Sequence, residues 1–160
     1  MKRRIWIDTD GGVDDALALA YALENPDLDV RGISTVCGNV SEDKSFLNMK
    51  HILSLFNRED VPVVRGESRP LRRKLIECNE VHGITGLGWI KPRHFDHGGE
   101  NIQEALSKTD AESIVCLGPL SNIASHLRAI EGNGSIRNIH ALCGTINQPN
   151  FHTGEYNLYV

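Results

Sequence analysis

Long apolar runs and strong net charge are both missing from this sequence. No stretch is apolar for the roughly 20 residues that a membrane-spanning helix requires, so we expect neither a transmembrane helix nor a membrane partner. The 17 Lys and Arg residues against 21 Asp and Glu give a formal net charge of -4. Proteins whose main partner is a nucleic acid are typically basic, and the composition therefore argues against that partner.

Cysteine is scarce, and its spacing fits no common cysteine motif. The four residues Cys37, Cys78, Cys116 and Cys143 form no C-x-x-C pair and no Cys/His pattern, so a zinc site or a redox pair is not expected. Cys37 and Cys116 end strand-like apolar runs and are interpreted as small core residues. A chain without a disulfide framework is typical of a reducing compartment, and we expect a cytoplasmic protein.

The hydrophobic pattern predicts alternating strands and helices. With 160 residues and 40% hydrophobic content, residues 1–160 are expected to form a single domain. Short β-branched runs predict strands at 4–9, 28–37, 61–64, 113–117 and 136–142, and helical spacing predicts helices at 14–24, 41–56 and 100–107. Residues 65–100 lack clear periodicity, which is typical of a functional lid or of irregular packing. The alternation indicates an α/β fold with an open, mainly parallel sheet and helices on both faces.

One further helix is expected after the fourth strand. Gly118-Pro119 opens it, because proline is well tolerated in the first turn of a helix. Its core face is predicted to carry Leu120, Ile123, Ala124 and Leu127.

The most informative segment is an acidic cluster near the N-terminus. Asp8, Asp10, Asp14 and Asp15 surround a Gly11-Gly12 turn between the first strand and the first helix. In open α/β sheets, ligand sites lie outside the carboxyl ends of the strands. Crowded carboxylates repel one another unless a cation or a hydrogen-bonding substrate compensates their charge. A plainer interpretation makes Asp14 an N-cap and Asp15 a favourable first-turn acid, but it does not explain the whole cluster.

Several segments together resemble one known family. Residues 8–16, Asp-Thr-Asp-Gly-Gly-Val-Asp-Asp-Ala, resemble the DTDPGxDDA signature of the inosine-uridine preferring nucleoside hydrolases, with Gly11 at the place of the usual proline. The segments 37–40, 81–87 and 117–124 agree with that family in order and spacing, and 154–157 resembles its AEFN element. The resemblance covers essentially the whole chain. Members of the family continue well past this length, so the chain looks like their N-terminal half.

The resemblance implies a calcium-dependent hydrolase that cleaves the N-glycosidic bond of a ribonucleoside, giving ribose and a free base. By this likeness Ca²⁺ is held by the carboxylates of Asp10 and Asp15 and by the backbone carbonyl of Leu117. Asp10 also acts as the general base toward the attacking water. The residues implied in substrate binding are Asp14, Asn39, Glu155 and Asn157 for the ribose hydroxyls, His82 near the base or the 5′ side of the sugar, and Asn150 as a further ribose ligand.

The length of the chain qualifies this expectation. In the family a His-Asp pair from the C-terminal half adds a calcium carboxylate and a group near the leaving base. Because Ca²⁺ prefers about 6 to 8 oxygens, we expect weak metal affinity and slow turnover for these 160 residues. We also expect either a homo-oligomer, formed through an open sheet edge, or a second chain that completes the fold.

Two other functions are compatible with parts of the pattern. Residues 7–11 also resemble the DxDG motif of haloacid dehalogenase phosphatases, but that leaves Asp14, Asp15, Asn39 and 155–157 unexplained. No suitably placed later Lys and Asp-Asp pair supports it. The other alternative is a non-catalytic module that binds ribose or nucleosides, or an inactive remnant.

Overall fold

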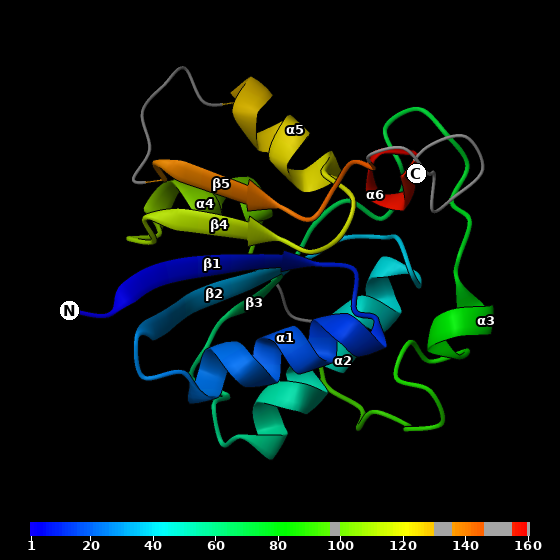
Figure 1. Cartoon of the computed structure of the whole chain (residues 1–160), viewed down its shortest axis with the longest axis horizontal. Coiled ribbons are helices and arrows are strands. Elements are labelled where there is room, and N and C mark those ends of the chain that lie inside the picture. Colours follow the sequence, from blue (N-terminus) through cyan, green and yellow to red (C-terminus); the bar gives the residue numbers. More distant parts are fainter. Residues whose placement is uncertain (97–99, 130–135, 146–154, 160) are drawn as a thin grey trace.

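A five-stranded parallel sheet forms the centre of the molecule. The computed structural model describes residues 1–96, 100–129, 136–145 and 155–159. Neighbouring strands follow the order β3-β2-β1-β4-β5, and every pair is parallel (Figure 1). The strands are β1 (Arg3–Thr9), β2 (Leu28–Thr35), β3 (Val63–Arg65), β4 (Ser113–Cys116) and β5 (Asn138–Ala141). The predicted fold class is confirmed, with β1 in the middle of the sheet.

Helices cover both faces of the sheet. Helices α1 (Val13–Glu24) and α2 (Glu42–Leu55) pack on one face, and α4 (Ile102–Lys108) and α5 (Ser121–Ala129) on the other (Figure 1). Two single-turn helices, α3 (Asn79–His82) and α6 (Tyr156–Tyr159), lie outside these layers, near the carboxyl ends of the strands. Neither short helix was expected from the sequence, because one turn is too short to produce a periodic pattern.

Strand alternation divides the core of β1 between the two faces. Ile5 and Ile7 point to the face covered by α1 and α2, where they join a buried cluster with Leu19 of α1 and Phe46 of α2. Trp6 points to the opposite face, into the cluster built with α4 and α5. Each sheet face therefore has its own apolar layer, as a doubly covered parallel sheet requires.

The orientation of α5 differs from the prediction at one position. Ile123 is buried as expected, but Leu127 is 53% exposed. The helix instead buries Asn122 and His126, which are 0% and 4% exposed. Hydrogen bonds of the Asn122 side chain to Asp8 and to the Thr35 carbonyl fix the rotation of the helix, and this rotation leaves Leu127 at the surface.

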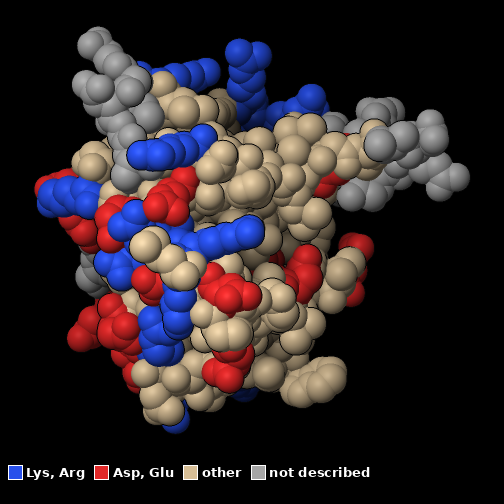
Figure 2. All heavy atoms as spheres, turned by 60° about the vertical axis from the view of Figure 1, so that its left-hand side comes forward, with Lys and Arg blue, Asp and Glu red and all other residues tan. Residues whose placement is uncertain are grey.

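The parallel topology brings the carboxyl ends of all five strands to one edge. The loops that follow β1, β2 and β4, which carry the residues at 10–12, 37–39 and 117–118, therefore meet there together with the first turn of α1. Acidic and basic side chains are interspersed on the face drawn in Figure 2, where the two signs do not separate into large patches. Within the described residues, no helix is both long and apolar enough to cross a membrane.

Candidate functional site

Two buried carboxylates lie at the carboxyl end of β1 and in the first turn of α1. Asp10 is 0% exposed and Asp15 is 2% exposed. Asp10 accepts hydrogen bonds from the backbone N–H of Asn39 at 2.7 Å and from its side-chain amide at 3.2 Å. Asp15 accepts from the Thr9 hydroxyl at 2.5 Å and from the Gly12 N–H at 2.9 Å. These donors hold both carboxyl groups in fixed positions.

Burial and mutual repulsion raise the pKa values of this pair. Burial raises the pKa of Asp10 well above its ordinary value, and the charges of Asp15 and Asp14 raise it further. Burial also raises the pKa of Asp15, although the bonds from Thr9 and Gly12 oppose that change. The carboxyl groups of Asp10 and Asp15 interact directly. A cation placed beside them would offset the repulsion and favour the charged form of both.

The turn between β1 and α1 depends on glycine. Gly11 has φ +73°, and a Cβ there would lie 2.5 Å from the Ser45 Cα, so no other residue fits without displacement. Gly12 is the N-cap of α1, and Asp14 and Asp15 lie in its first turn. The interpretation of Asp14 as the N-cap is therefore wrong, because the Gly11-Gly12 turn starts the helix earlier. Asp15 fulfils the first-turn role through its bond to the Gly12 N–H.

Two further glycines leave room for the Asp10 side chain. A Cβ on Gly38 would lie 2.1 Å from the Asp10 Oδ2, and a Cβ on Gly118 would lie 2.9 Å from the Asp10 Cβ. The loops after β2 and β4 therefore enclose Asp10 from two sides. Close packing of backbone around one carboxylate is typical of a site that must hold it in a single orientation.

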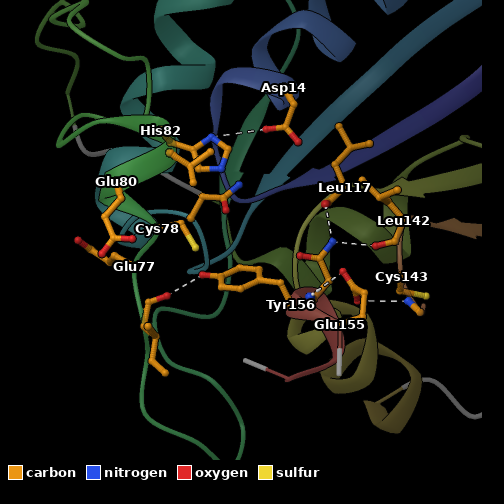
Figure 3. A pocket seen from close by; sticks show the side chains of 15 residues that line it. Asp14, Glu77, Cys78, Glu80, His82, Leu117, Leu142, Cys143, Glu155 and Tyr156 are labelled. Atoms are coloured by element: carbon orange, nitrogen blue, oxygen red, sulfur yellow. Dashed lines mark hydrogen bonds and ion pairs between the residues drawn. The ribbon is translucent and has the colours of Figure 1, made fainter. Parts of the chain in front are cut away.

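A cavity of about 510 Å³ lies at the same edge of the sheet, lined by Asn39, which donates to Asp10, and by Asp14, whereas Asp10 and Asp15 themselves do not line it. Its lining residues come from α1, α3 and α6, from the loops after β2, β4 and β5, and from residues 76–78 (Figure 3). Its walls include five of the six residues predicted to bind substrate, together with Leu117. The five are Asp14, Asn39, His82, Glu155 and Asn157. The sixth, Asn150, lies outside the described residues.

His82 and Asp14 form one side of the cavity. The His82 Nδ1 accepts a hydrogen bond from the Val13 N–H at 3.2 Å and lies 3.6 Å from the Asp14 carboxylate. The Asp14 side chain is 66% exposed, whereas that of His82 is 12% exposed. Asp14 therefore remains accessible to a ligand, and His82 is held against the N-terminus of α1.

Glu155 and Asn157 form the opposite side of the cavity. The Asn157 side-chain amide donates to the backbone carbonyls of Leu117 at 2.8 Å and Leu142 at 2.7 Å. Glu155 accepts from the backbone N–H groups of Gly144, Asn157 and Leu158, each at 3.2 Å. These bonds attach α6 to the ends of β4 and β5. The Leu117 carbonyl keeps a second lone pair for another partner.

Sequence reasoning missed the roles of Asp8 and Asn122 beneath the site. Asp8 points away from the cavity and accepts hydrogen bonds from Ser34 and from Asn122, the latter at 2.7 Å. Burial raises the pKa of Asp8 to about 7, against the effect of these two donors. Its other oxygen has no partner among the described residues. The only sequence signal was the position of Asn122 within the 117–124 motif.

The three predicted metal ligands would all present oxygens. They are the carboxylates of Asp10 and Asp15 and the carbonyl of Leu117, and these ligand types suit Ca²⁺. Within the part of the chain that is described, no group of three or more His, Cys, Asp or Glu side chains is placed to hold a metal ion. The predicted Ca²⁺ ligands include only two such side chains, Asp10 and Asp15, because the third ligand is a backbone carbonyl.

Comparisons with known proteins agree on one family. The family model for the inosine-uridine preferring nucleoside hydrolases matches residues 5–160. A pyrimidine-specific ribonucleoside hydrolase RihA from Photobacterium profundum is 38% identical over 169 residues, which cover 100% of this chain and 54% of the relative. A RihA from Escherichia coli O81 is 36% identical, with 98% of this chain and 53% of the relative covered. The chain thus spans about half the length of the curated relatives it matches.

Solved structures give the same result. The plant nucleoside hydrolase PpNRh1 superposes with a TM-score of 0.82 at 33% identity, covering 91% of this chain and 49% of that protein. A purine-preferring ribonucleoside hydrolase from Gardnerella vaginalis superposes with a TM-score of 0.79 at 28% identity, covering 92% of this chain and 50% of that protein. The similarity therefore extends from sequence to three-dimensional structure.

Proposed function

Because this chain belongs to the inosine-uridine preferring nucleoside hydrolase family, we propose that it hydrolyses the N-glycosidic bond of ribonucleosides, releasing ribose and a free base. The observation that carries the proposal is the cavity that gathers Asp14, Asn39, His82, Glu155 and Asn157, one of which, Asn39, is hydrogen-bonded to the buried Asp10. A sugar with several hydroxyls matches these polar side chains. The chain spans about half of its relatives, so the complete activity is part of the proposal.

The residues of this chain divide into two chemical roles. Asp14, Asn39, Glu155 and Asn157 bind the ribose hydroxyls and orient the sugar, while His82 contacts the base or the 5′ side. Asp10 accepts a proton from the water that attacks the anomeric carbon, and the two hydrogen bonds from Asn39 hold its carboxylate in position for this role. Departure of the base leaves positive charge on the ribose ring, and nearby carboxylates stabilise that charge.

Ca²⁺ is the cation that we propose for the site. Asp10, Asp15 and the Leu117 carbonyl would hold it, and the two interacting buried carboxylates fit a divalent ion. When bound, the ion binds sugar hydroxyls and lowers the pKa of a water molecule. Three protein oxygens are fewer than the roughly 6 to 8 that Ca²⁺ prefers, so these 160 residues are expected to bind it weakly.

The proposal also covers the base that is released, the cellular compartment and the assembly of the protein. The two curated relatives are named for pyrimidine nucleosides and one solved structure for purine nucleosides, so both classes are tested. The cysteines within the described residues are free thiols, which supports a reducing compartment such as the cytoplasm. A homo-oligomer or a complementing chain remains the proposed assembly.

The decisive experiment measures ribose release from uridine, cytidine, inosine and adenosine, with Ca²⁺ and after its chelation. We expect release with Ca²⁺, loss on chelation, and a fall of about 10²- to 10⁴-fold in Asp10→Asn, the usual effect of losing a general base. The control variant Asp27→Asn changes an exposed carboxylate on the loop after α1 and should leave release unchanged. Phosphate release from a phosphomonoester, with nucleosides untouched, would instead indicate a phosphatase.

A non-catalytic nucleoside-binding module is the second candidate function. The observation that favours it is that five predicted substrate residues line one cavity, whereas the proposed general base Asp10 does not line it. Calorimetric titration with ribose and inosine in the presence of Ca²⁺ distinguishes the cases. Binding without ribose release identifies a module, and binding with release identifies the enzyme.

A further inference from the structure

Tyr156 connects the two sides of the cavity. It lies on α6 between Glu155 and Asn157, and its hydroxyl donates a hydrogen bond to the Ile76 carbonyl at 2.7 Å (Figure 3). The hydroxyl also lies beside the Cys78 thiol. Burial raises the pKa of Tyr156, so the hydroxyl keeps its proton and remains a donor across the physiological range.

The partner of Tyr156 is a loosely packed segment, 76–82. Ile76 and Val81 in this segment are 41% and 74% exposed. A segment with so little buried apolar surface is held mainly by its hydrogen bonds. One anchor runs from the Cys78 N–H to the Asn39 carbonyl at 2.9 Å. A second joins His82 to the Val13 N–H.

Both of these anchors attach segment 76–82 to the side of the cavity formed by β2 and α1. The Tyr156 hydroxyl attaches the same segment to α6, which carries Asn157 and directly follows Glu155. This hydrogen bond therefore adds a direct link between the segment that ends at His82 and the helix that carries Asn157. All of these residues line the cavity.

We propose that Tyr156 is a positioning residue whose hydroxyl latches segment 76–82 to α6 and so sets the width of the nucleoside cavity. The effect on substrate binding rests on the proposed function, because a cavity of fixed width favours a nucleoside that contacts both of its sides. It acts through His82, Glu155 and Asn157 and takes no part in bond cleavage. Loss of the hydroxyl should weaken nucleoside binding without changing the chemistry at Asp10.

The kinetic test compares Tyr156→Phe with the intact chain. This variant removes one oxygen and keeps the ring, so the fold is preserved. We expect KM for the nucleoside to rise about two- to twelve-fold, the range for one neutral hydrogen bond, with kcat unchanged. The matched control is Tyr21→Phe, which removes the hydroxyl of an exposed tyrosine on α1 that accepts a bond from Asn25. It should change neither constant.

A merely structural role would give a different result. Tyr156→Phe would then lower kcat together with the thermal unfolding temperature, because less protein is folded, and KM would stay the same. That outcome overturns the latch. Equal KM and equal kcat in the variant and the intact chain also overturn it.

Hydrogen exchange tests the latch without substrate. We expect backbone amides of 77–83 to exchange faster in Tyr156→Phe than in the intact chain and in Tyr21→Phe, while amides of β1 and β2 stay unchanged. Unaltered exchange in 77–83 overturns the latch whether or not the protein is active. If the intact chain neither binds nor hydrolyses nucleosides, the proposed function fails, and the exchange result still decides whether Tyr156 restrains the segment.

Discussion

The Asn122 side chain joins three segments that are far apart in the sequence. Its amide nitrogen donates to Asp8 at 2.7 Å and to the Thr35 carbonyl at 3.0 Å, and its oxygen accepts from the Glu67 N–H at 2.7 Å. One side chain on α5 thus connects β1, β2 and the loop after β3 immediately below the candidate site. Because Asn122 is fully buried, water cannot replace these bonds.

We therefore expect Asn122→Ala to be strongly destabilising. The variant removes three hydrogen bonds, although the Asp8 oxygen keeps another from Ser34, and each buried donor or acceptor left without a partner costs about 1–3 kcal/mol. Urea unfolding should give a free energy of unfolding lower by at least about 2 kcal/mol. The control Asn138→Ala, at an exposed position of β5, should change it by less than about 0.5 kcal/mol. Equal stability of the two variants would show that Asn122 is not a structural link.

The difference between Asp10 and Asn122 explains which site residues can be predicted from the sequence. Asp10 and Asp15 stand in one short motif at the end of a strand, and local pattern alone places both near a ligand site. Asn122 acquires its role through Asp8, 114 positions away in the chain. Only the folded structure reveals such a contact, because no local pattern encodes it.

Trp6 and Gly32 show how one strand accommodates its neighbour. The register between β1 and β2 shifts at Ile5/Trp6, and Trp6 pairs with Gly32. A Cβ on Gly32 would lie 2.3 Å from the Trp6 ring, so the glycine provides the space for the indole. The indole N–H in turn donates to the Ser34 hydroxyl at 3.0 Å, which fixes the ring.

Gly32→Ala is expected to lower the free energy of unfolding by about 1–3 kcal/mol, because the added methyl overpacks the face shared with α4. Thermal or urea unfolding measures the loss. In the double variant Trp6→Phe with Gly32→Ala, the smaller ring leaves room for the added methyl. The double variant should therefore lose less unfolding free energy than the sum of the losses in the two single variants. Strictly additive losses would contradict a steric conflict between these two positions.

Helix α5 also carries a buried histidine that makes its packing sensitive to acid. The His126 Nδ1 lies 3.1 Å from the Gln103 Oε1 of α4, and burial lowers the pKa of His126. Protonation is thus easier in the unfolded chain than in the folded protein. The stability that neutral His126 contributes is present above its ordinary pKa of 6.5 and is lost as the pH falls below it.

The check is urea unfolding at about pH 8 and about pH 5.5, on either side of the ordinary histidine pKa. The intact chain should lose more stability between these values than His126→Gln, which keeps a polar group beside Gln103 but cannot titrate. Because the other histidines are present in both proteins, the difference between them isolates His126. Identical pH dependence would show that His126 is not responsible.

The limits of the longer elements were predicted more closely than those of the short strand β3. The strand predicted at 4–9 is Arg3–Thr9, and the helix predicted at 41–56 is Glu42–Leu55, because long periodic segments determine their own ends. The strand predicted at 61–64 is Val63–Arg65. Its limits depend on pairing with Ile33 to Thr35 of β2, which the sequence of the strand itself does not contain.

At the scale of the whole molecule, β5 is an outer strand of the sheet formed by the described residues. Each of its four residues, 138–141, is exposed, whereas β1 in the middle of the sheet is mostly buried. Ile139 is 44% exposed and the adjoining Leu142 is 58% exposed. Within the described residues, β5 pairs with β4 alone, so the backbone groups on its other side are available to another strand.

We accordingly expect the 160-residue chain to self-associate through β5, unless a complementing chain occupies that edge. Sedimentation velocity over a concentration series should reveal a species larger than the monomer. Ile139→Lys should shift the equilibrium toward the monomer, because a charge on an edge strand opposes pairing with another strand. Leu17→Lys, which places the same charge at a 68% exposed position of α1 away from this edge, is the matched control and should leave association unchanged. A chain that stays monomeric at every concentration would contradict self-association through β5. Equal effects of Ile139→Lys and Leu17→Lys on association would show that the contact does not involve β5.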